Sequence, residues 1–196
     1  MHRRSFLTGL SASAALVPAT PLWALNEAGA SKLINSLVAD INTVIASGKA
    51  ENAMFREFER IFKRYSDTSY IAAYALGVDA RRATKTQKRN FSKTFQGYIS
   101  RKYGKRFREF IGGSLEVKSV KRVKKWYEVS TLARLQGQAP FEVTFLVSDR
   151  SGKDLFFNMY IEGVNLLLTE RTEIGAILDS NKGDIDAMIA ELKRLS

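Results

Sequence analysis

The chain has 196 residues, enough for a domain with a substantial core, and its 31 Lys and Arg against 20 Asp and Glu give a formal charge of +11. It has no cysteine, and its single histidine, His2, is the second residue. The chain beyond His2 therefore excludes disulfides, Ser-His and Cys-His catalysis, and the usual transition-metal ligands. The basic charge favours a polyanionic partner, either nucleic acid or an anionic membrane surface.

The first residues have the order of an export signal. Arg3-Arg4 is followed by a short apolar stretch from Phe6 to Val17 and by a small-residue site at Leu22-Trp23-Ala24. That stretch is too short to span a bilayer. We therefore predict a cleavable signal peptide over 1–24 and a single exported domain over 25–196. The arginine pair also resembles a twin-arginine signal, which exports folded proteins, and an ordinary secretory signal with two arginines is the alternative.

The first half of the remaining chain has the period of helices. Apolar residues recur every three or four positions from Leu33 to Ile45, from Met54 to Tyr65 and from Tyr70 to Leu76. A longer apolar stripe runs from Phe91 to Ile111, and the opposite face of the same segment carries basic residues from Lys85 to Arg108. These patterns predict helices over all of these ranges, the last of them strongly basic.

After Gly113 the period of the apolar residues changes from about 3.6 to 2, which predicts strands. Short turns rich in glycine separate the alternating segments, as in an antiparallel meander. In chain order, the predicted strands run from Leu115 to the basic run Lys121–Lys125, from Tyr127 to Ala133, from Phe141 to Val147 and from Asp154 to Leu168.

Two further helices are predicted to close the chain, from Thr169 to Leu178 and from Asp184 to Leu195. Helices, then about four antiparallel strands, then helices define the α+β class. We expect the N- and C-terminal helices to cover one face of a curved sheet.

Four segments carry a more specific pattern: Ser69–Gly77, Ala83–Phe95, Tyr127–Thr131, and Tyr160–Leu167 with Arg171. Their order and spacing resemble the MlaC, or toluene-tolerance (Tol-Tol), family over about residues 30 to 195. Within the last segment the chain departs from the family pattern. Asn165 replaces the usual serine and, further on, Glu170 replaces the usual tyrosine, which leaves the identity of the lipid open.

The resemblance implies a fold like nuclear transport factor 2 that encloses an apolar cavity for phospholipid tails. It also implies a periplasmic carrier, neither an enzyme nor a nucleic-acid binder, without metal or cofactor. Such a carrier shuttles phospholipid between an outer-membrane lipoprotein complex and an inner-membrane ABC transporter with an MCE-domain subunit, and so maintains outer-membrane lipid asymmetry. The alternatives are a hopanoid-associated lipid carrier of the same family, or a basic periplasmic module that binds polyanions or membrane surfaces.

The chemistry of lipid transfer agrees with this expectation. Two acyl chains expose about thirty CH₂ groups, and at about 0.8 kcal/mol each their exposure to water costs on the order of 20 kcal/mol. Each apolar residue of the long helix and the sheet could line a cavity or pack a filled core. The candidate lipid-binding residues are Phe91, Phe95, Tyr98, Ile99, Val129, Thr131, Val143, Phe145, Val147, Phe157, Met159 and Ile161. Arg171 is the candidate for the head-group phosphate, or else a structural partner of Glu162 or Glu170.

Two other classes of function compete with the carrier. A nucleic-acid binder would account for the charge, but most aromatic residues fall on the apolar stripes, where they would be buried rather than offered for stacking. An enzyme would need a nucleophile and a base, and near the last strand only Glu162 and Asp154 are available. Both readings are weaker than a binding module.

Overall fold

The computed structural model of the chain describes residues 24–104 and 113–195. The predicted signal peptide, apart from Ala24, and the predicted end of the basic helix beyond Gly104 lie outside the described residues. Within them, six α-helices and one five-stranded antiparallel sheet make up the fold. The predicted α+β class is therefore confirmed.

The helical first half begins at residues that cap their helices. Asn26 Oδ1 accepts a hydrogen bond from Gly29 N at 2.8 Å, and Asp67 Oδ1 accepts one from Tyr70 N at 3.0 Å. The elements are α1 (Glu27–Ala46), α2 (Glu51–Tyr65), α3 (Thr68–Leu76), the short 3₁₀ helix η1 (Gly77–Arg81) and α4 (Lys85–Gly104).

The strands pair in chain order, each antiparallel to the one before it, as a meander requires. The basic run from Lys121 lies at the end of β1 and in the two-residue turn into β2. The elements are β1 (Ser114–Val123), β2 (Trp126–Arg134), β3 (Phe141–Ser148), β4 (Leu155–Ile161), β5 (Val164–Asn165), α5 (Leu166–Ser180) and α6 (Ile185–Leu195).

The predicted long strand from Asp154 to Leu168 is wrong in its second half. Glu162 and Gly163 both have positive φ, 50° and 79°, which is the backbone of a type I′ hairpin turn. The chain therefore folds back into β5, which has two residues, instead of continuing. Asn165 then caps a helix, since its Oδ1 accepts from Leu168 N at 3.1 Å, and α5 begins at Leu166.

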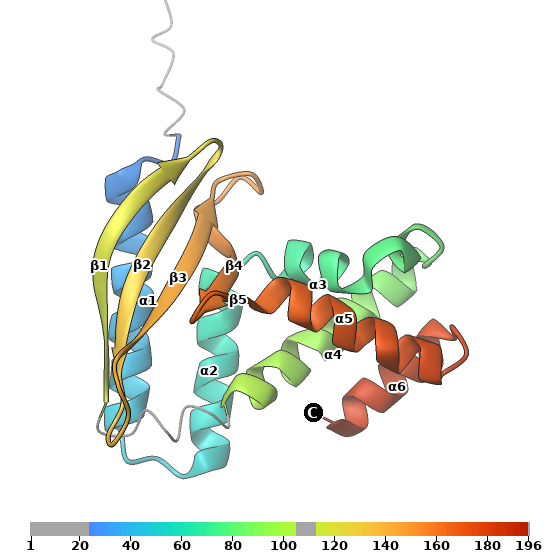
Figure 1. The fold of residues 1–196 in the computed structure, drawn as a ribbon. Coiled ribbons are helices and arrows are strands. Elements are labelled where there is room, and N and C mark those ends of the chain that lie inside the picture. Colours follow the sequence, from blue (N-terminus) through green and yellow to red (C-terminus); the bar gives the residue numbers. More distant parts are fainter. Residues whose placement is uncertain (1–23, 105–112, 196) are drawn as a thin grey trace, which may run out of the picture.

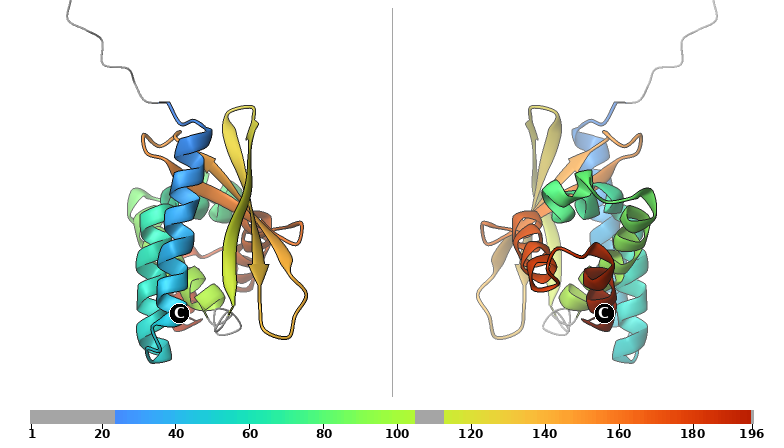
Figure 2. Two further views of the ribbon diagram at one scale, coloured as in Figure 1. Left: turned by 90° about the vertical axis from the view of Figure 1, so that its left-hand side faces the viewer. Right: turned by 90° about the vertical axis from the view of Figure 1, so that its right-hand side faces the viewer.

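The helices form two groups around the sheet. In Figure 1, α1 lies along one face of β1, β2 and β3, with α2 beside it, whereas α3, α4, α5 and α6 extend beyond the β4 edge. Figure 2 shows α1 and α2 side by side from one direction and the second group from the other. The expectation that the C-terminal helices also cover the sheet face holds only in part. Helix α5 contacts β4, but α6 packs mainly on α4.

Candidate functional site

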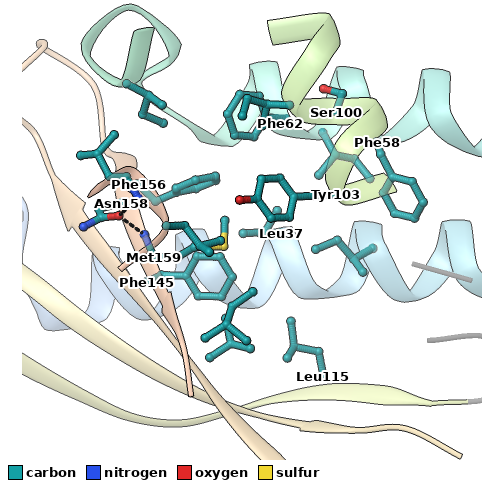
Figure 3. A pocket seen from close by; sticks show the side chains of 18 of the residues that line it. Leu37, Phe58, Phe62, Ser100, Tyr103, Leu115, Phe145, Phe156, Asn158 and Met159 are labelled. Carbon is teal, nitrogen blue, oxygen red and sulfur yellow. Dashed lines mark hydrogen bonds between the residues drawn. The ribbon is translucent and has the colours of Figure 1, made fainter. Parts of the chain in front are cut away.

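A cavity of about 520 Å³ lies where the sheet meets α1, α2, α4 and α5 (Figure 3). This volume is within the range of about 300–1,000 Å³ that is typical of small-molecule sites. Its wall is largely apolar and rich in aromatic rings, among them Phe58 and Phe62 from α2, Phe145 from β3 and Phe156 from β4. Phe145 and Phe156 meet edge to face, with their ring centroids 5.5 Å apart. An apolar wall of this kind suits a hydrocarbon ligand.

The structure brings part of the predicted lipid-binding set into this wall. The members come from the last turns of α4 and from strands β3 and β4. These wall residues are Ile99, Val143, Phe145, Phe157, Met159 and Ile161.

The other predicted residues are buried outside the wall: Phe91, Phe95, Tyr98, Val129, Thr131 and Val147. Helix α4 packs against α2, α3 and α6 (Figure 1). Only its C-terminal end lines the cavity. The rings of Phe91 and Phe95 stack on each other in the earlier part of α4, with their centroids 5.3 Å apart. Val129 pairs with Phe145 across the sheet and lies in the part of the sheet that α1 packs against, but it does not line the cavity.

Arg171, the predicted head-group residue, also lies outside the wall. Its guanidinium carbon is 5.3 Å from the centroid of the Tyr74 ring. It also packs on the end of α3, where a Cβ added to Gly77 would lie 3.2 Å from Arg171 Nε. Among the ion pairs of the described residues, none joins Arg171 to Glu162 or Glu170, the structural partners considered for it.

Sequence analysis missed the contribution of the first two helices to the wall. Leu37 and Ile41 of α1 and Phe58, Ile61 and Phe62 of α2 all line the cavity. Their spacing predicted a buried helical face, which is correct, but a period of 3.6 is the same whether that face meets a filled core or a void.

The exposed members of the wall lie at turns. They are Gln138 and Ala139, between β2 and β3, and Glu162, between β4 and β5. The part of the wall that meets solvent therefore lies beside these two hairpin turns.

Asn158 fixes the junction between the sheet and α5. It is 7% exposed, and its Oδ1 accepts hydrogen bonds from Met159 N at 2.8 Å and from Leu167 N at 3.1 Å. Its Nδ2 donates to Asn165 Oδ1 at 3.0 Å. Because two N–H groups of the first turn of α5 are satisfied by Asn158 and Asn165, this helix end is held in place by carboxamides.

A cluster of charged and phenolic groups joins α4 to α5 beside the cavity. Glu170 is 3% exposed, and its Oε1 accepts from Lys102 Nζ at 2.8 Å and from the Tyr103 hydroxyl. Glu173 accepts from Lys102 and from the Tyr98 hydroxyl. We call these five residues the α4–α5 ion cluster.

Burial and neighbouring charge set the protonation of the cluster. Burial, and then the hydrogen bonds to the carboxylates, raise the pKa of Tyr98 and of Tyr103 well above the ordinary value, so both stay protonated donors. Burial alone would lower the pKa of Lys102, but the two carboxylates outweigh it and raise that pKa. Conversely, burial favours a higher pKa for Glu173, and the hydrogen bonds from Lys102 and Tyr98 lower it.

The described part of the chain contains neither a metal cluster nor a helix that could span a membrane. Over residues 24–104 and 113–195, no group of three or more acidic or His side chains is placed to hold a metal ion. No helix over these ranges combines the length and the apolar character needed to cross a membrane.

The fold and the cavity define an α+β domain with an apolar ligand cavity between sheet and helices. The model of the MlaC protein family matches residues 32–194, and the chain belongs to that family. The resemblance seen in the sequence is thereby confirmed.

A solved structure shares the fold. It is a phospholipid-binding protein from Ralstonia solanacearum, determined in complex with a phospholipid. The two chains superpose with a TM-score of 0.73 at 16% sequence identity, over 85% of this chain and 96% of the other. Comparison with curated protein sequences finds no match.

Proposed function

We propose that this protein binds a phospholipid in the apolar cavity and carries it through the periplasm. The observation that supports the proposal is the cavity itself, about 520 Å³ in volume, with an aromatic wall built from both helix groups and the sheet. Transfer of a single sixteen-carbon chain from water into such a wall is worth roughly 12 kcal/mol at about 0.8 kcal/mol per CH₂ group. The similar fold of the phospholipid-binding protein from Ralstonia solanacearum supports the same ligand class.

The wider role follows from family membership and from the N-terminal sequence. A carrier that takes lipid from an outer-membrane lipoprotein complex to an inner-membrane ABC transporter with an MCE-domain subunit needs export, and residues 1–24 have the pattern of an export signal. The same wall supports a carrier rather than an enzyme. Its two acids are Glu162, exposed at a turn, and Glu170, which is bound by Lys102 and Tyr103.

The test is to produce the full chain in a Gram-negative host and recover it from the periplasm without detergent. We expect an N-terminus at Leu25 by mass spectrometry and near-stoichiometric phospholipid in a chloroform–methanol extract. A hopanoid in that extract would instead assign the hopanoid-associated alternative. A folded protein that contains no lipid and takes none from vesicles would refute the carrier.

A matched pair of variants ties the lipid to the cavity. Val143→Phe places a ring in the wall, so we expect it to lower the amount of bound lipid. Val164→Phe makes the same change on the same sheet at a residue that is 55% exposed and outside the wall, and should leave the lipid unchanged. Equal lipid content in the two variants would place the ligand elsewhere.

One observation favours a second role at the surface. Lys121, Arg122, Lys124 and Lys125 are all exposed around the β1–β2 turn, and each cation near an anionic membrane is worth roughly 1 kcal/mol. We propose that this turn docks the carrier on anionic membranes. Co-sedimentation with vesicles that contain anionic lipid should fall when both Lys124 and Lys125 are replaced by Gln, while the lipid content stays the same.

A further inference from the structure

The wall of the cavity is not apolar throughout. Ser100 and Tyr103 lie one turn apart on α4, both facing the cavity, and both are labelled in Figure 3. Glu170 of α5 is the third polar member of this region of the wall, since the Tyr103 hydroxyl donates to its Oε1. We call Ser100, Tyr103 and Glu170 the polar patch.

Over residues 24–104 and 113–195, two oxygen atoms of the polar patch have no hydrogen-bond partner. They are Ser100 Oγ and Glu170 Oε2, and both are buried. The residues that carry them are 5% and 3% exposed. A buried acceptor without a donor is destabilising, and more so when it is charged, so such atoms are rare in folded proteins.

Among the described residues, the neighbouring donors bond to other oxygens of the cluster. Lys102 and Tyr103 both donate to Glu170 Oε1, and Lys102 and Tyr98 both donate to Glu173. An ionised carboxylate has about four acceptor positions on its two oxygens. Oε1 of Glu170 therefore accepts two hydrogen bonds from the protein, while Oε2 can still accept hydrogen bonds.

The charge of the cluster restricts what can bind there. One cation, Lys102, faces two carboxylates, Glu170 and Glu173, so the α4–α5 ion cluster has a net negative charge. A phosphate group would be repelled from it, and a neutral hydroxyl or a cationic ammonium would be favoured.

We propose that the polar patch is a subsite that accepts a hydrogen bond from a hydroxyl or ammonium group of the bound lipid. The inference rests on the proposed function and adds a selectivity to it. A lipid with such a donor near the patch should bind about tenfold tighter than one without, as expected for one hydrogen bond to a charged acceptor. The donor could belong to the head group or to a hydroxylated acyl chain.

A competition between three lipids tests this and separates the two sources. Dioleoyl-phosphatidylcholine has no hydrogen-bond donor, dioleoyl-phosphatidylethanolamine has an ammonium head group, and diricinoleoyl-phosphatidylcholine has a hydroxyl on each chain. The purified protein is incubated with vesicles that contain equal amounts of the three, re-isolated, and its lipid is quantified by mass spectrometry. We expect about tenfold enrichment of one donor-bearing lipid over dioleoyl-phosphatidylcholine. The enriched lipid then identifies the source.

Two variants tie the selectivity to the patch. Glu170→Leu removes the acceptor and should abolish the enrichment, which is measured as a ratio between the lipids that the variant retains. Glu173→Gln, which changes a carboxylate of the same ion cluster outside the wall, should keep it. If Glu170→Leu does not fold, Glu170→Gln keeps the shape of the side chain, removes its charge and should weaken the enrichment.

The unmodified protein alone can refute the inference. Equal retention of the three lipids would overturn the polar subsite and leave the lipid carrier standing. Retention of none of them would overturn both.

Discussion

Truncation of two buried phenylalanines should distinguish the cavity wall from the filled core. Phe95 and Phe145 are 1% and 3% exposed, and each has aromatic neighbours. Only Phe145 lines the cavity. The same substitution, Phe→Ala, therefore removes the same atoms from two sites that differ chiefly in whether one side of the ring already faces a void.

The expected magnitudes follow from that difference. A buried Phe→Ala substitution costs about 3–5 kcal/mol, part of which is the energy of the new cavity. At Phe95 the cavity is new, so the loss should be near 5 kcal/mol. At Phe145 the ring has fewer partner atoms to lose and the space joins an existing void, so the loss should be about 3 kcal/mol or less.

The assay is urea unfolding of the delipidated protein, followed by circular dichroism, with stabilities compared at equal m-values. Phe145→Ala should also change the lipid content of the protein isolated without delipidation, whereas Phe95→Ala should not. Equal losses of stability at the two sites would refute the reasoning, because they would mean that the space around Phe145 is as filled as that around Phe95.

Three further predictions concern the backbone, the ion cluster and the acids near the N-terminal segment. Gly77→Ala should destabilise the protein by about 2 kcal/mol, since φ at Gly77 is +62° and the added Cβ would crowd Arg171, whereas Gly97→Ala, in open space within α4, should stabilise it by about 0.5 kcal/mol; thermal unfolding measures both. Lys102→Met should lower the free energy of unfolding by about 2 kcal/mol at pH 7, a value reduced for the partial exposure of Lys102. The loss should be smaller below about pH 4.5, because the lowered pKa of Glu173 contributes stability that disappears as the pH falls through that pKa. Urea unfolding at the two pH values measures this difference. Burial, and then the charge of Asp149, raise the pKa of Asp154, so Asp149→Asn should lower that pKa in an NMR titration without restoring its ordinary value.

Strand β2 could be predicted from sequence because it is buried on one face. The exposure of β2 alternates residue by residue from Trp126 to Arg134, and the sequence shows the same alternation as apolar and polar side chains. The predicted strand from Asp154 to Leu168 was wrong where apolar residues continue without a change of period. Leu166, Leu167 and Leu168 follow β4 and its turn, and nothing in their hydropathy distinguishes a helix from a further strand. The marks were the Glu-Gly turn and the capping Asn165, both of which are local.

The sequence predicted that an apolar cavity exists but not which residues line it. An amphipathic stripe shows which residues avoid water, but the void depends on how the elements cross, which no local pattern records. Phe91 and Ile99 belong to the same stripe of α4 and have similar burial, 1% and 6%. They differ in site because the cavity lies beside the last two turns of α4, where Ile99 is, and not beside the earlier part of the helix.

The ion cluster offers a physical reason why this cavity stays open. Helices α4 and α5 form adjoining parts of the wall, and apolar side chains between them would gain by closing the gap. Lys102, Tyr98 and Tyr103 instead hold Glu170 and Glu173 through hydrogen bonds, which weaken as they lengthen and as they bend away from linearity. Such bonds oppose collapse as well as separation. The two helices are thereby linked by polar groups at one side of an apolar chamber.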